Sequence, residues 1–420
     1  MSKGPLNIAM LCIHSSPVGD LGTRDTGGMS VYIRELAREL GLRGHRVDIY
    51  TRSCNGNSGT VPLYENVRLI HLSAAGALHV SKAEIYPHLA DFFCSLRQHY
   101  LQRPTAYDII HSHYWLSGVL GRWAGSFWNV PHVLMFHTLG AVKNNAGFKN
   151  IEPELRVAVE KKLSEQCCRI IVPSARERDN LLCYYRVSDD KIGVVACGVD
   201  LKQFRLGSKA GARKRLGFDR DEALIVYVGR FDPLKGIDRL LKAACHVKYS
   251  GTFRVVIIGG DGPADPARRR LQRLVAEGGL MDRVVFAGSI NHDDLPSYYS
   301  AADTVIVPSY YESFGLVALE ALACGTPVIA APVGAMEDII HHGQTGCIVH
   351  NPTPLSLAGC IDTFLSKSLK NILSPSDIRR SVLKFSWAQA ADAILDEYRA
   401  ATKKHRQPET PDLLTARSPL

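Results

Sequence analysis

Short apolar runs rich in β-branched residues alternate with helix-like patterns along almost the whole chain, and this alternation constrains the fold more than any other feature. In the first half the runs are Leu6–His14, Val47–Arg52, Val67–Leu72, Ile109–His113, His132–Thr138, Arg169–Ser174 and Ile192–Cys197. In the second half they are Leu224–Arg230, Val255–Gly259, Val284–Gly288, Val305–Ser309, Val328–Ala331 and Cys347–Val349. Between the first two runs, apolar residues recur at helical spacing from Met29 to Leu40. Strand, helix and strand repeated in this way predict an α/β fold with parallel sheets covered on both faces.

The length of the chain, 420 residues, predicts two domains, because a single ordinary core does not grow this large. The apolar runs divide about equally on either side of the segment ACGVDLKQF (196–204), which we therefore interpret as a hinge between two doubly wound domains. We expect an N-terminal Rossmann-like domain over 1–197 and a C-terminal one over 198–384. A helix over 385–401 should pack back on the N-terminal domain, and 402–420 should be a mobile tail.

The composition is that of a globular protein, with 46% hydrophobic and 22% charged residues. No apolar run reaches the length of a membrane span, and we expect a cytoplasmic protein without a signal peptide. The eleven cysteines include no C-x-x-C pair, which favours reduced thiols over disulfides or zinc ligands. The net charge of +9 comes without a basic stripe interleaved with aromatic residues, so we do not predict nucleic-acid binding. Phosphorylated small molecules or an acidic membrane surface explain the excess equally well.

The segment GRFDPLKGIDRL (229–240) places two cations in the loop after a predicted strand. Arg230 and Lys235 stand between Gly229 and Gly236, which allow the backbone to approach a ligand closely. A guanidinium fork and an ammonium suit a pyrophosphate. The alternative is a solvated loop with two ordinary surface charges.

The segment YYESFGLVALEALACGTPVIA (310–330) carries two carboxylates around a helix entrance that follows the predicted strand TVIVPS. Glu312 precedes the helix, and Glu320 lies inside an apolar helical run, where an unpaired carboxylate would be costly. At a helical rise of ~1.5 Å per residue, the two groups should be roughly ten ångströms apart. This separation exceeds the one used by retaining glycosidases. It suits two acceptors at opposite ends of a nucleotide sugar, with the diphosphate at the helix N-terminus. A purely structural Glu320 would not explain the pair.

Several segments in order resemble the retaining glycosyltransferases of family 4, which have the GT-B fold of two Rossmann-like domains facing across a cleft. The resemblance spans roughly residues 6–400. It rests on DTGGMSVYI (25–33), HSHYWLSG (111–118), FHTLGAVKN (136–144), VVACGVDLKQF (194–204), VGRFDPLKG (228–236), GGDGP (259–263), PSYYESFGLVALEALACGTPVIA (308–330) and TGCIV (345–349).

The resemblance implies a catalytic role for Arg230 and Lys235, which would neutralise the leaving diphosphate. Glu320 would hold the ribose hydroxyls, and Glu312 the 3- or 4-hydroxyl of the transferred sugar. His137 would bond the donor's 6-hydroxyl and stabilise an oxocarbenium-like transition state, although a lone histidine at a strand end is more often structural. The donor site implied by the resemblance comprises Gly28, Gly229, Arg230, Lys235, Phe314, Gly315, Leu316, Val317 and Glu320.

The resemblance also implies an acceptor site and the absence of a cofactor. Lys82, Tyr114, Thr138 and Arg156 match the positions that grip the acceptor phosphate in inositol-phosphate N-acetylglucosaminyltransferases of mycothiol synthesis, and sucrose-phosphate synthases hold fructose 6-phosphate similarly. Ser30 stands where the mycothiol enzymes have Asn, which weakens the case for inositol. No metal is expected, because the side chains of Arg230 and Lys235 would supply the positive charge at the leaving group. The segment DRD (219–221) is similar to a metal-binding D-x-D motif, but we interpret it as a polar turn.

The sequence therefore predicts transfer of glucose or N-acetylglucosamine from a nucleoside-diphosphate sugar, with UDP favoured, to a small phosphorylated polyol or sugar such as inositol phosphate. Transfer to fructose 6-phosphate is one alternative. Another is a membrane-surface transferase acting on lipid or polysaccharide, for which the N-terminal half offers no strongly amphipathic basic helix. A third is a nucleotide-sugar-binding regulator or an epimerase of the same fold. The sequence is compatible with a homodimer and does not determine the oligomeric state.

Overall fold

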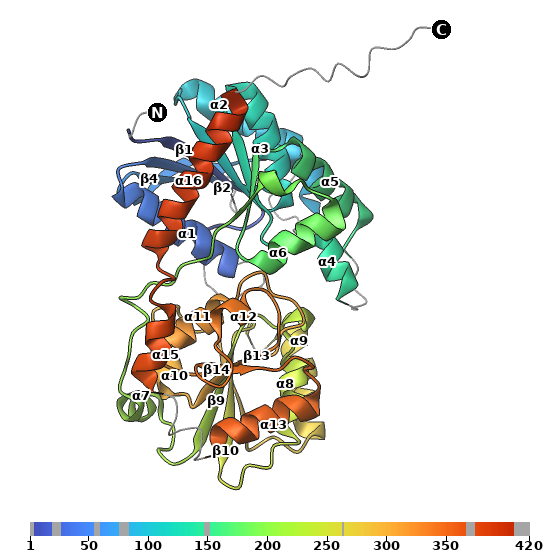
Figure 1. Ribbon diagram of the computed structural model, residues 1–420. Helices are drawn as coiled ribbons and strands as arrows, with labels where there is room; N and C mark the ends of the chain where they lie inside the picture. Colours follow the sequence, from blue (N-terminus) through green and yellow to red (C-terminus); the bar gives the residue numbers. More distant parts are fainter. Residues whose placement is uncertain are drawn as a thin grey trace.

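The computed structural model describes residues 4–18, 27–53, 59–74, 84–146, 152–262, 264–366 and 374–406. It has two lobes, each built on one sheet with helices packed against it (Figure 1). The sequence prediction of two doubly wound α/β domains is confirmed.

The sheet of the N-terminal lobe has eight described strands in the order β3-β4-β2-β1-β5-β6-β7-β8. All neighbouring pairs are parallel except β3 and β4, which are antiparallel. The sequence prediction omitted β3, because this edge strand contains Pro62 and has no buried residue. The strands are β1 Asn7–Cys12, β2 Arg46–Arg52, β3 Gly59–Tyr64, β4 Val67–Leu72, β5 Ile109–His113, β6 His132–Met135, β7 Arg169–Val172 and β8 Ile192–Val194.

The sheet of the C-terminal lobe has six described strands, all parallel, in the order β11-β10-β9-β12-β13-β14. Each of the six apolar runs predicted for the second half of the chain contributes one of them. They are β9 Ala223–Val228, β10 Phe253–Ile258, β11 Val284–Gly288, β12 Thr304–Val307, β13 Val328–Ala330 and β14 Gly346–Ile348.

Helices connect the strands and bury their apolar faces against the sheets. The predicted amphipathic helix after the first strand is α1 Gly28–Leu42, whose Tyr32, Ile33 and Leu36 are buried. The other helices of the N-terminal lobe are η2 Tyr86–His88, α2 Leu89–Gln102, α3 Trp115–Trp128, α4 Gly140–Asn145, α5 Glu154–Gln166, α6 Ala175–Asn180, η3 Leu181–Tyr185 and η4 Asp189–Lys191. Those that follow are α7 Lys209–Leu216, η5 Pro233–Lys235, α8 Ile237–Ala244, α9 Pro266–Glu277, α10 Leu295–Ala301, α11 Leu316–Ala323, α12 Met336–Ile339, α13 Pro354–Leu365, α15 Pro375–Val382 and α16 Trp387–Arg406.

The helix α16 leaves the C-terminal lobe and lies along the N-terminal lobe (Figure 1). The Tyr398 hydroxyl is 2.9 Å from His111 Nδ1, and Arg43, the residue after α1, donates to the Ala388 carbonyl at 2.7 Å. The expectation that a tail begins at residue 402 is wrong for 402–406, which continue the helix. The basic residues there suit a helix C-terminus, where the dipole favours positive charge. Residues 407–420 of the predicted tail lie outside the described residues.

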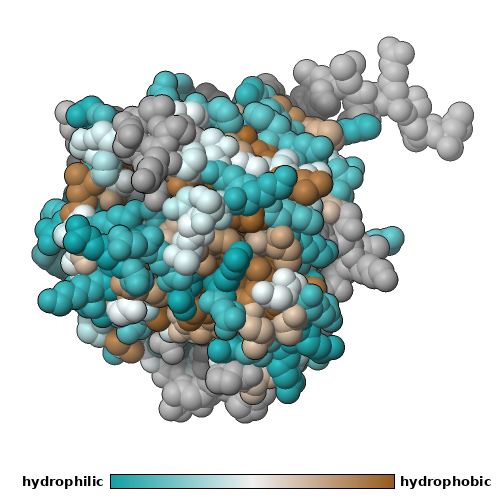
Figure 2. Space-filling view, turned by 90° about the horizontal axis from the view of Figure 1, so that it is seen from below, coloured by the Kyte–Doolittle hydropathy of each residue, from teal (hydrophilic) through white to brown (hydrophobic). Residues whose placement is uncertain are grey.

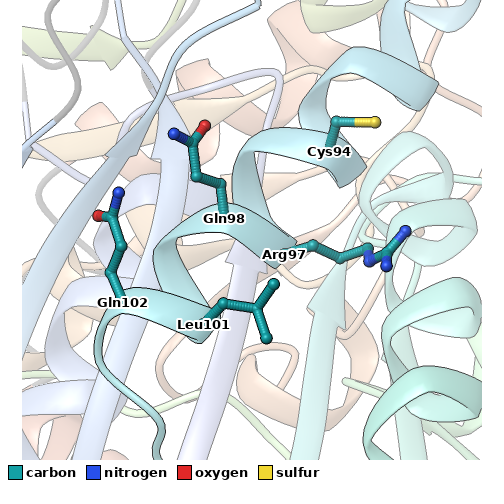
Figure 3. Close-up of a pocket in the computed structure, with 5 residues that line it drawn as sticks. All are labelled: Cys94, Arg97, Gln98, Leu101 and Gln102. Atoms are coloured by element: carbon teal, nitrogen blue, oxygen red, sulfur yellow. The ribbon is translucent and has the colours of Figure 1, made fainter.

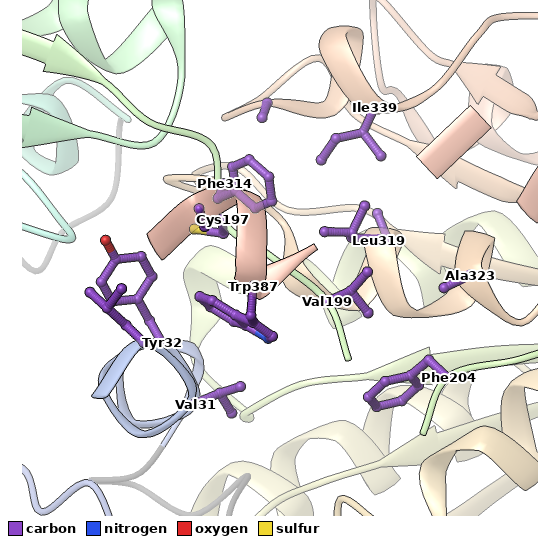
Figure 4. Close-up of a cluster of buried hydrophobic side chains, with 14 of the residues drawn as sticks. Val31, Tyr32, Cys197, Val199, Phe204, Phe314, Leu319, Ala323, Ile339 and Trp387 are labelled. Atoms are coloured by element: carbon purple, nitrogen blue, oxygen red, sulfur yellow. The ribbon is translucent and has the colours of Figure 1, made fainter. Parts of the chain in front are cut away.

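The two chain segments that cross between the lobes are paired with each other. The Val199 amide donates to the Phe385 carbonyl at 2.9 Å, and Val199 forms a parallel bridge with Ser386. Gly198 packs against the Trp387 backbone, and a Cβ atom on Gly198 would lie 2.4 Å from Trp387 N. The apolar cluster around this point includes Tyr32 of α1 and other buried side chains from both lobes (Figure 4).

One cysteine pair departs from the prediction of reduced thiols. The structure pairs Cys347 of β14 with Cys360 of α13, 13 residues later, as a disulfide. Both side chains lie where this strand packs against the helix after it. The sequence contains no C-x-x-C spacing that would predict this pair. The other eight cysteines of the described residues are not in disulfides.

Every helix within the described ranges is too short or too polar to cross a bilayer. Seen from below, the molecule shows polar side chains around the edge and apolar ones scattered among them toward the middle (Figure 2).

We expect the Gly198→Ala variant to lose about 1–3 kcal/mol of stability, because the added methyl group would overlap the Trp387 backbone where the two crossings meet. The matched control is Gly359→Ala, at an exposed position of α13 with nothing within 4 Å of an added Cβ. This control should gain about 0.5–1 kcal/mol, since alanine favours a helix interior more than glycine does. Urea unfolding measures both, and equal effects of the two substitutions would contradict the packing described here.

Candidate active site

A cavity of about 920 Å³ lies between the two lobes and is lined by residues from both. It is bordered by loops that follow β1, β5 and β6 in one sheet and β9 and β12 in the other, at the carboxyl ends of the strands. Most of the site residues predicted from the sequence line it: Gly28, Tyr114, His137, Thr138, Arg156, Gly229, Arg230, Lys235, Glu312, Phe314, Gly315, Leu316, Val317 and Glu320.

One described residue of the predicted site, Ser30, does not line the cavity. Ser30 is buried, and its hydroxyl lies 3.3 Å from Ser15 Oγ and donates to the Ser16 carbonyl at 3.0 Å. It does not line the cavity, so a direct contact of Ser30 with an acceptor finds no support. Lys82 lies outside the described residues.

Two helix N-termini meet across the cavity. A Cβ atom on Gly28, the first residue of α1, would lie 3.4 Å from Leu316 Cδ1, at the start of α11. Gly315 precedes α11 with φ of 115°, a backbone conformation that side chains other than glycine's rarely allow. Neither helix has a side-chain cap at its N-terminus. Their amides and dipoles therefore make this part of the cavity favourable for an anion.

The two predicted cations occupy the same region in different ways. Lys235 Nζ forms an ion pair with Glu312 Oε1, which also accepts a hydrogen bond from Ser309 at 3.2 Å. Arg230 is 39% exposed, and its Nε would be 3.8 Å from a Cβ atom on Gly27 across the cavity. The sequence analysis treated Lys235 and Glu312 as contacts for different parts of a ligand, whereas here they neutralise each other.

Both oxygens of the Glu320 carboxylate have partners. Oε1 lies 2.8 Å from His292 Nε2, and Oε2 accepts a hydrogen bond from Tyr299 at 2.8 Å. Burial alone would lower the pKa of His292, but the Glu320 carboxylate outweighs it, so that the pKa of His292 is raised. Glu320 and His292 both line the cavity. Glu320 is thus held in place by the protein, and each oxygen keeps a further lone pair for a hydroxyl donor.

Two predicted site residues adopt unusual backbone conformations. His137 has φ of 59° and Tyr114 has φ of 76°. Such values are uncommon for residues other than glycine and tend to persist where function requires them. One ring nitrogen of His137, Nε2, lies 3.0 Å from Nδ1 of the buried His113, whose pKa burial lowers well below its ordinary value. A neutral His113 therefore orients His137 at the cavity wall.

The three described residues of the predicted acceptor site come together. The Arg156 guanidinium lies 4.8 Å from the centre of the Tyr114 ring and donates through Nη2 to the Thr138 carbonyl at 2.7 Å and hydroxyl at 3.0 Å. Arg156 is only 1% exposed, and its pKa remains above the ordinary value despite burial, because Glu160 and Glu152 lie beside it. The sequence analysis gave these two carboxylates no role, although each lies four residues from Arg156 along the chain.

Tyr311 ties the loop of Glu312 to the N-terminal lobe. Its hydroxyl accepts a hydrogen bond from the Leu139 amide at 3.2 Å and donates to Glu177 Oε2 at 3.4 Å. Burial raises the pKa of Glu177 to about 7. Tyr311 thus connects the segment beside Thr138 with the segment that carries Glu312.

Other residues of the cavity were missed by sequence reasoning. Lys143, Glu152 and His292 line the cavity although the sequence analysis gave them no role. The sequence could have indicated Lys143 as a site residue, since it lies in the segment FHTLGAVKN (136–144), which also contains His137 and Thr138. The other two lie in segments without a recognisable motif.

Two further features are separate from this cavity. In the DRD segment, Arg213 donates to the carbonyls of Asp219 and Arg220, as a polar turn requires, and neither aspartate lines the cavity. A second cavity, of about 370 Å³, follows one face of α2 and is lined by Cys94, Arg97, Gln98, Leu101 and Gln102 (Figure 3). A single helix supplies these five residues, and their side chains do not converge on one point.

Comparison with known proteins gives consistent matches over both lobes. Residues 26–203 match the family described as Glycosyltransferase Family 4, and residues 208–376 match Glycosyl transferases group 1. The D-inositol 3-phosphate glycosyltransferase of Acidothermus cellulolyticus is 38% identical over 97% of this chain and 93% of its own length. The solved structure of sucrose-phosphate synthase from Thermosynechococcus elongatus has a TM-score of 0.85 and 32% identity, covering 94% of this chain and 98% of that one. Anabaena HepE in complex with UDP and glucose, at 18% identity and a TM-score of 0.74 over 94% of this chain and 100% of that one, shares the fold.

In the Glu320→Gln variant we expect the pKa of His292 to fall below its ordinary value, because burial remains while the carboxylate that offsets it is gone. Proton NMR titration measures this, with His292→Gln to identify the resonance and Glu337→Gln as the exposed control. Because the folded-state pKa of His292 is raised, its pair with Glu320 stabilises the fold fully below the ordinary pKa of histidine, and this contribution is lost as the pH rises through the raised value. A His292 pKa unchanged by the substitution would contradict the assigned pair.

Proposed function

Because the chain belongs to glycosyltransferase family 4, whose members have the GT-B fold, we propose that it transfers a hexose from a nucleoside-diphosphate sugar to a small phosphorylated polyol. Glucose and N-acetylglucosamine are the candidate sugars, UDP is the favoured nucleotide, and inositol phosphate is the favoured acceptor. The observation that carries this proposal is the convergence of Tyr114, Thr138 and Arg156 on the N-terminal wall of a cavity whose opposite wall holds Arg230 and Lys235.

The donor lies on the C-terminal wall in this proposal. Its diphosphate meets the N-terminus of α11 and the side chains of Arg230 and Lys235, which neutralise the leaving group. Glu320, fixed by His292 and Tyr299, accepts hydrogen bonds from the ribose hydroxyls. When the diphosphate engages Lys235, Glu312 is released to accept a hydroxyl of the transferred sugar.

The transfer retains the configuration of the donor. No carboxylate is assigned as a nucleophile, so the acceptor hydroxyl attacks from the face of the leaving group, and the leaving phosphate accepts its proton. His137 contacts the sugar and is oriented by His113. The positive charge at the leaving group is supplied by side chains, and we expect no divalent metal in the chemistry.

Fructose 6-phosphate is the second candidate acceptor. The sucrose-phosphate synthase structure matches nearly all of both chains, and a sugar phosphate offers the same anion to Arg156 as an inositol phosphate does. We favour inositol because the similarity to the inositol phosphate enzyme is higher, at 38% identity over 97% of this chain.

We expect Arg230→Ala or Lys235→Ala to weaken binding of UDP by about 1.5–3 kcal/mol, the contribution of a charge-assisted hydrogen bond. Isothermal titration calorimetry measures the affinity. The control is Lys242→Ala, which removes a similar charge from the exposed face of α8, away from the cavity. If the affinity for UDP is unchanged in both variants, Arg230 and Lys235 do not bind the diphosphate and this part of the proposal is wrong.

Wild-type protein should use inositol 1-phosphate or fructose 6-phosphate at least ~10-fold more efficiently than the unphosphorylated forms, since one charged hydrogen bond is worth that factor. Thr138→Val should lower only the efficiency with phosphorylated acceptors. Arg156→Ala is the less informative variant, because it would leave the buried Glu160 without its partner.

These assays are run with EDTA and a UDP-sugar, and proton NMR of the product gives the anomeric configuration. A preference for unphosphorylated acceptors would refute the acceptor assignment and favour the membrane-surface alternative. A β-linked product from an α-linked donor would refute retention.

A further inference from the structure

The acceptor side of the cavity contains more charged groups than the predicted phosphate-binding residues. Arg156 of α5 is accompanied by Lys143, Glu152 and Glu160. Lys143 belongs to α4 and Glu160 to α5, and Glu152 lies just before the N-cap of α5. Lys143, Glu152 and Arg156 line the cavity, whereas Glu160 is fully buried beside Arg156. Their individual bonds show which of them a ligand can reach.

Most of the Arg156 guanidinium is already engaged by the protein. Nε donates to Glu160 Oε1 at 2.7 Å, and Nη2 donates to both oxygens of Thr138. The remaining nitrogen, Nη1, has no hydrogen bond of good geometry among the described residues. It lies 2.8 Å from Glu152 Oε1. A ligand can therefore meet the free donors of Arg156 only where Glu152 now lies.

The same Glu152 oxygen is held by a second cation. Lys143 Nζ donates to Glu152 Oε1 at 2.7 Å. Burial would raise the pKa of Glu152, but Arg156 and Lys143 outweigh it and lower the pKa. One carboxylate oxygen thus lies between an ammonium and a guanidinium, which is the environment that an oxygen of a phosphate requires.

The two carboxylates differ in how firmly they are held. Glu160 is fully buried, and its Oε2 accepts hydrogen bonds from the Gly140 amide and the Tyr185 hydroxyl. Glu152 is 22% exposed at the cavity. Its backbone is held on both sides by Asn144, so its side chain can rotate away without movement of the main chain. Glu160 is a fixed counter-ion, whereas Glu152 is replaceable.

We propose that an oxygen of the acceptor's phosphate replaces Glu152 Oε1 between Arg156 Nη1 and Lys143 Nζ. Lys143 is then a phosphate-binding residue, and Glu152 is an internal competitor that determines specificity. A neutral acceptor cannot displace Glu152, because the two cations would lose their anion and gain none. This inference rests on the proposed function, since it assumes a phosphorylated acceptor.

The test measures binding of inorganic phosphate by calorimetry and the KM for inositol 1-phosphate and fructose 6-phosphate. Lys143→Met should weaken phosphate binding and raise KM about 10-fold, as expected for loss of a charged hydrogen bond. Glu152→Gln should do the opposite and tighten phosphate binding about 3- to 10-fold, because the competing charge is gone. The matched controls are Lys161→Met and Glu154→Gln, exposed residues of α5 with the same changes of charge.

The gain expected for Glu152→Gln cannot arise from a damaged fold, so the two variants together exclude a general loss of structure. Phosphate binding that is equal in Lys143→Met and Lys161→Met, or no tighter in Glu152→Gln than in Glu154→Gln, would overturn the inference. If wild-type protein prefers phosphorylated acceptors while both variants behave as their controls, this inference fails and the proposed function stands. If wild-type protein prefers unphosphorylated acceptors, the proposed function fails first.

Discussion

The pairing of the two chain crossings between the lobes is the constraint on which the active site depends. The first crossing, at Gly198 and Val199, lies against the second, at Phe385 to Trp387, through a backbone hydrogen bond and a bridge. A side chain at position 198 would overlap the Trp387 backbone. Both crossings therefore enter the same apolar cluster, which contains Tyr32 of α1 and holds the carboxyl ends of the two sheets toward one cavity (Figure 4).

Within that cavity, charged side chains of the protein pair with one another. Lys235 pairs with Glu312, and His292 pairs with Glu320. Unpaired buried charges would be costly, so charged side chains in a cavity wall need partners within the protein. In the proposed function, a bound ligand would exchange one partner for another, so that residues for a diphosphate, a sugar and a phosphate would lie in one cavity without destabilising the fold.

The pairs are of two kinds: in some, a buried partner holds a site side chain in place, and in others, a ligand in the cavity can displace the partner. His113 is buried and neutral and holds His137, while Tyr299 and His292 hold Glu320. His113 and Tyr299 are fully buried and do not line the cavity, so a ligand there cannot replace them. The ion pair of Lys235 borders the cavity, where a ligand can compete for it. Preorganisation by buried partners is a feature of sites in which charge develops during the reaction.

The amino-acid sequence by itself determined the fold class, because the periods of strands and helices and their alternation are local properties that follow from side-chain spacing. It also indicated most of the cavity wall, from Arg230 to Glu320, since loops at the carboxyl ends of parallel strands must gather at one edge of a sheet. It did not indicate β3, whose Pro62 and exposed side chains lack the apolar pattern of the central strands. Only the tertiary structure decided the pairing of His292 with Glu320 and of Lys235 with Glu312, because these residues come from segments whose distance in space depends on how whole elements pack.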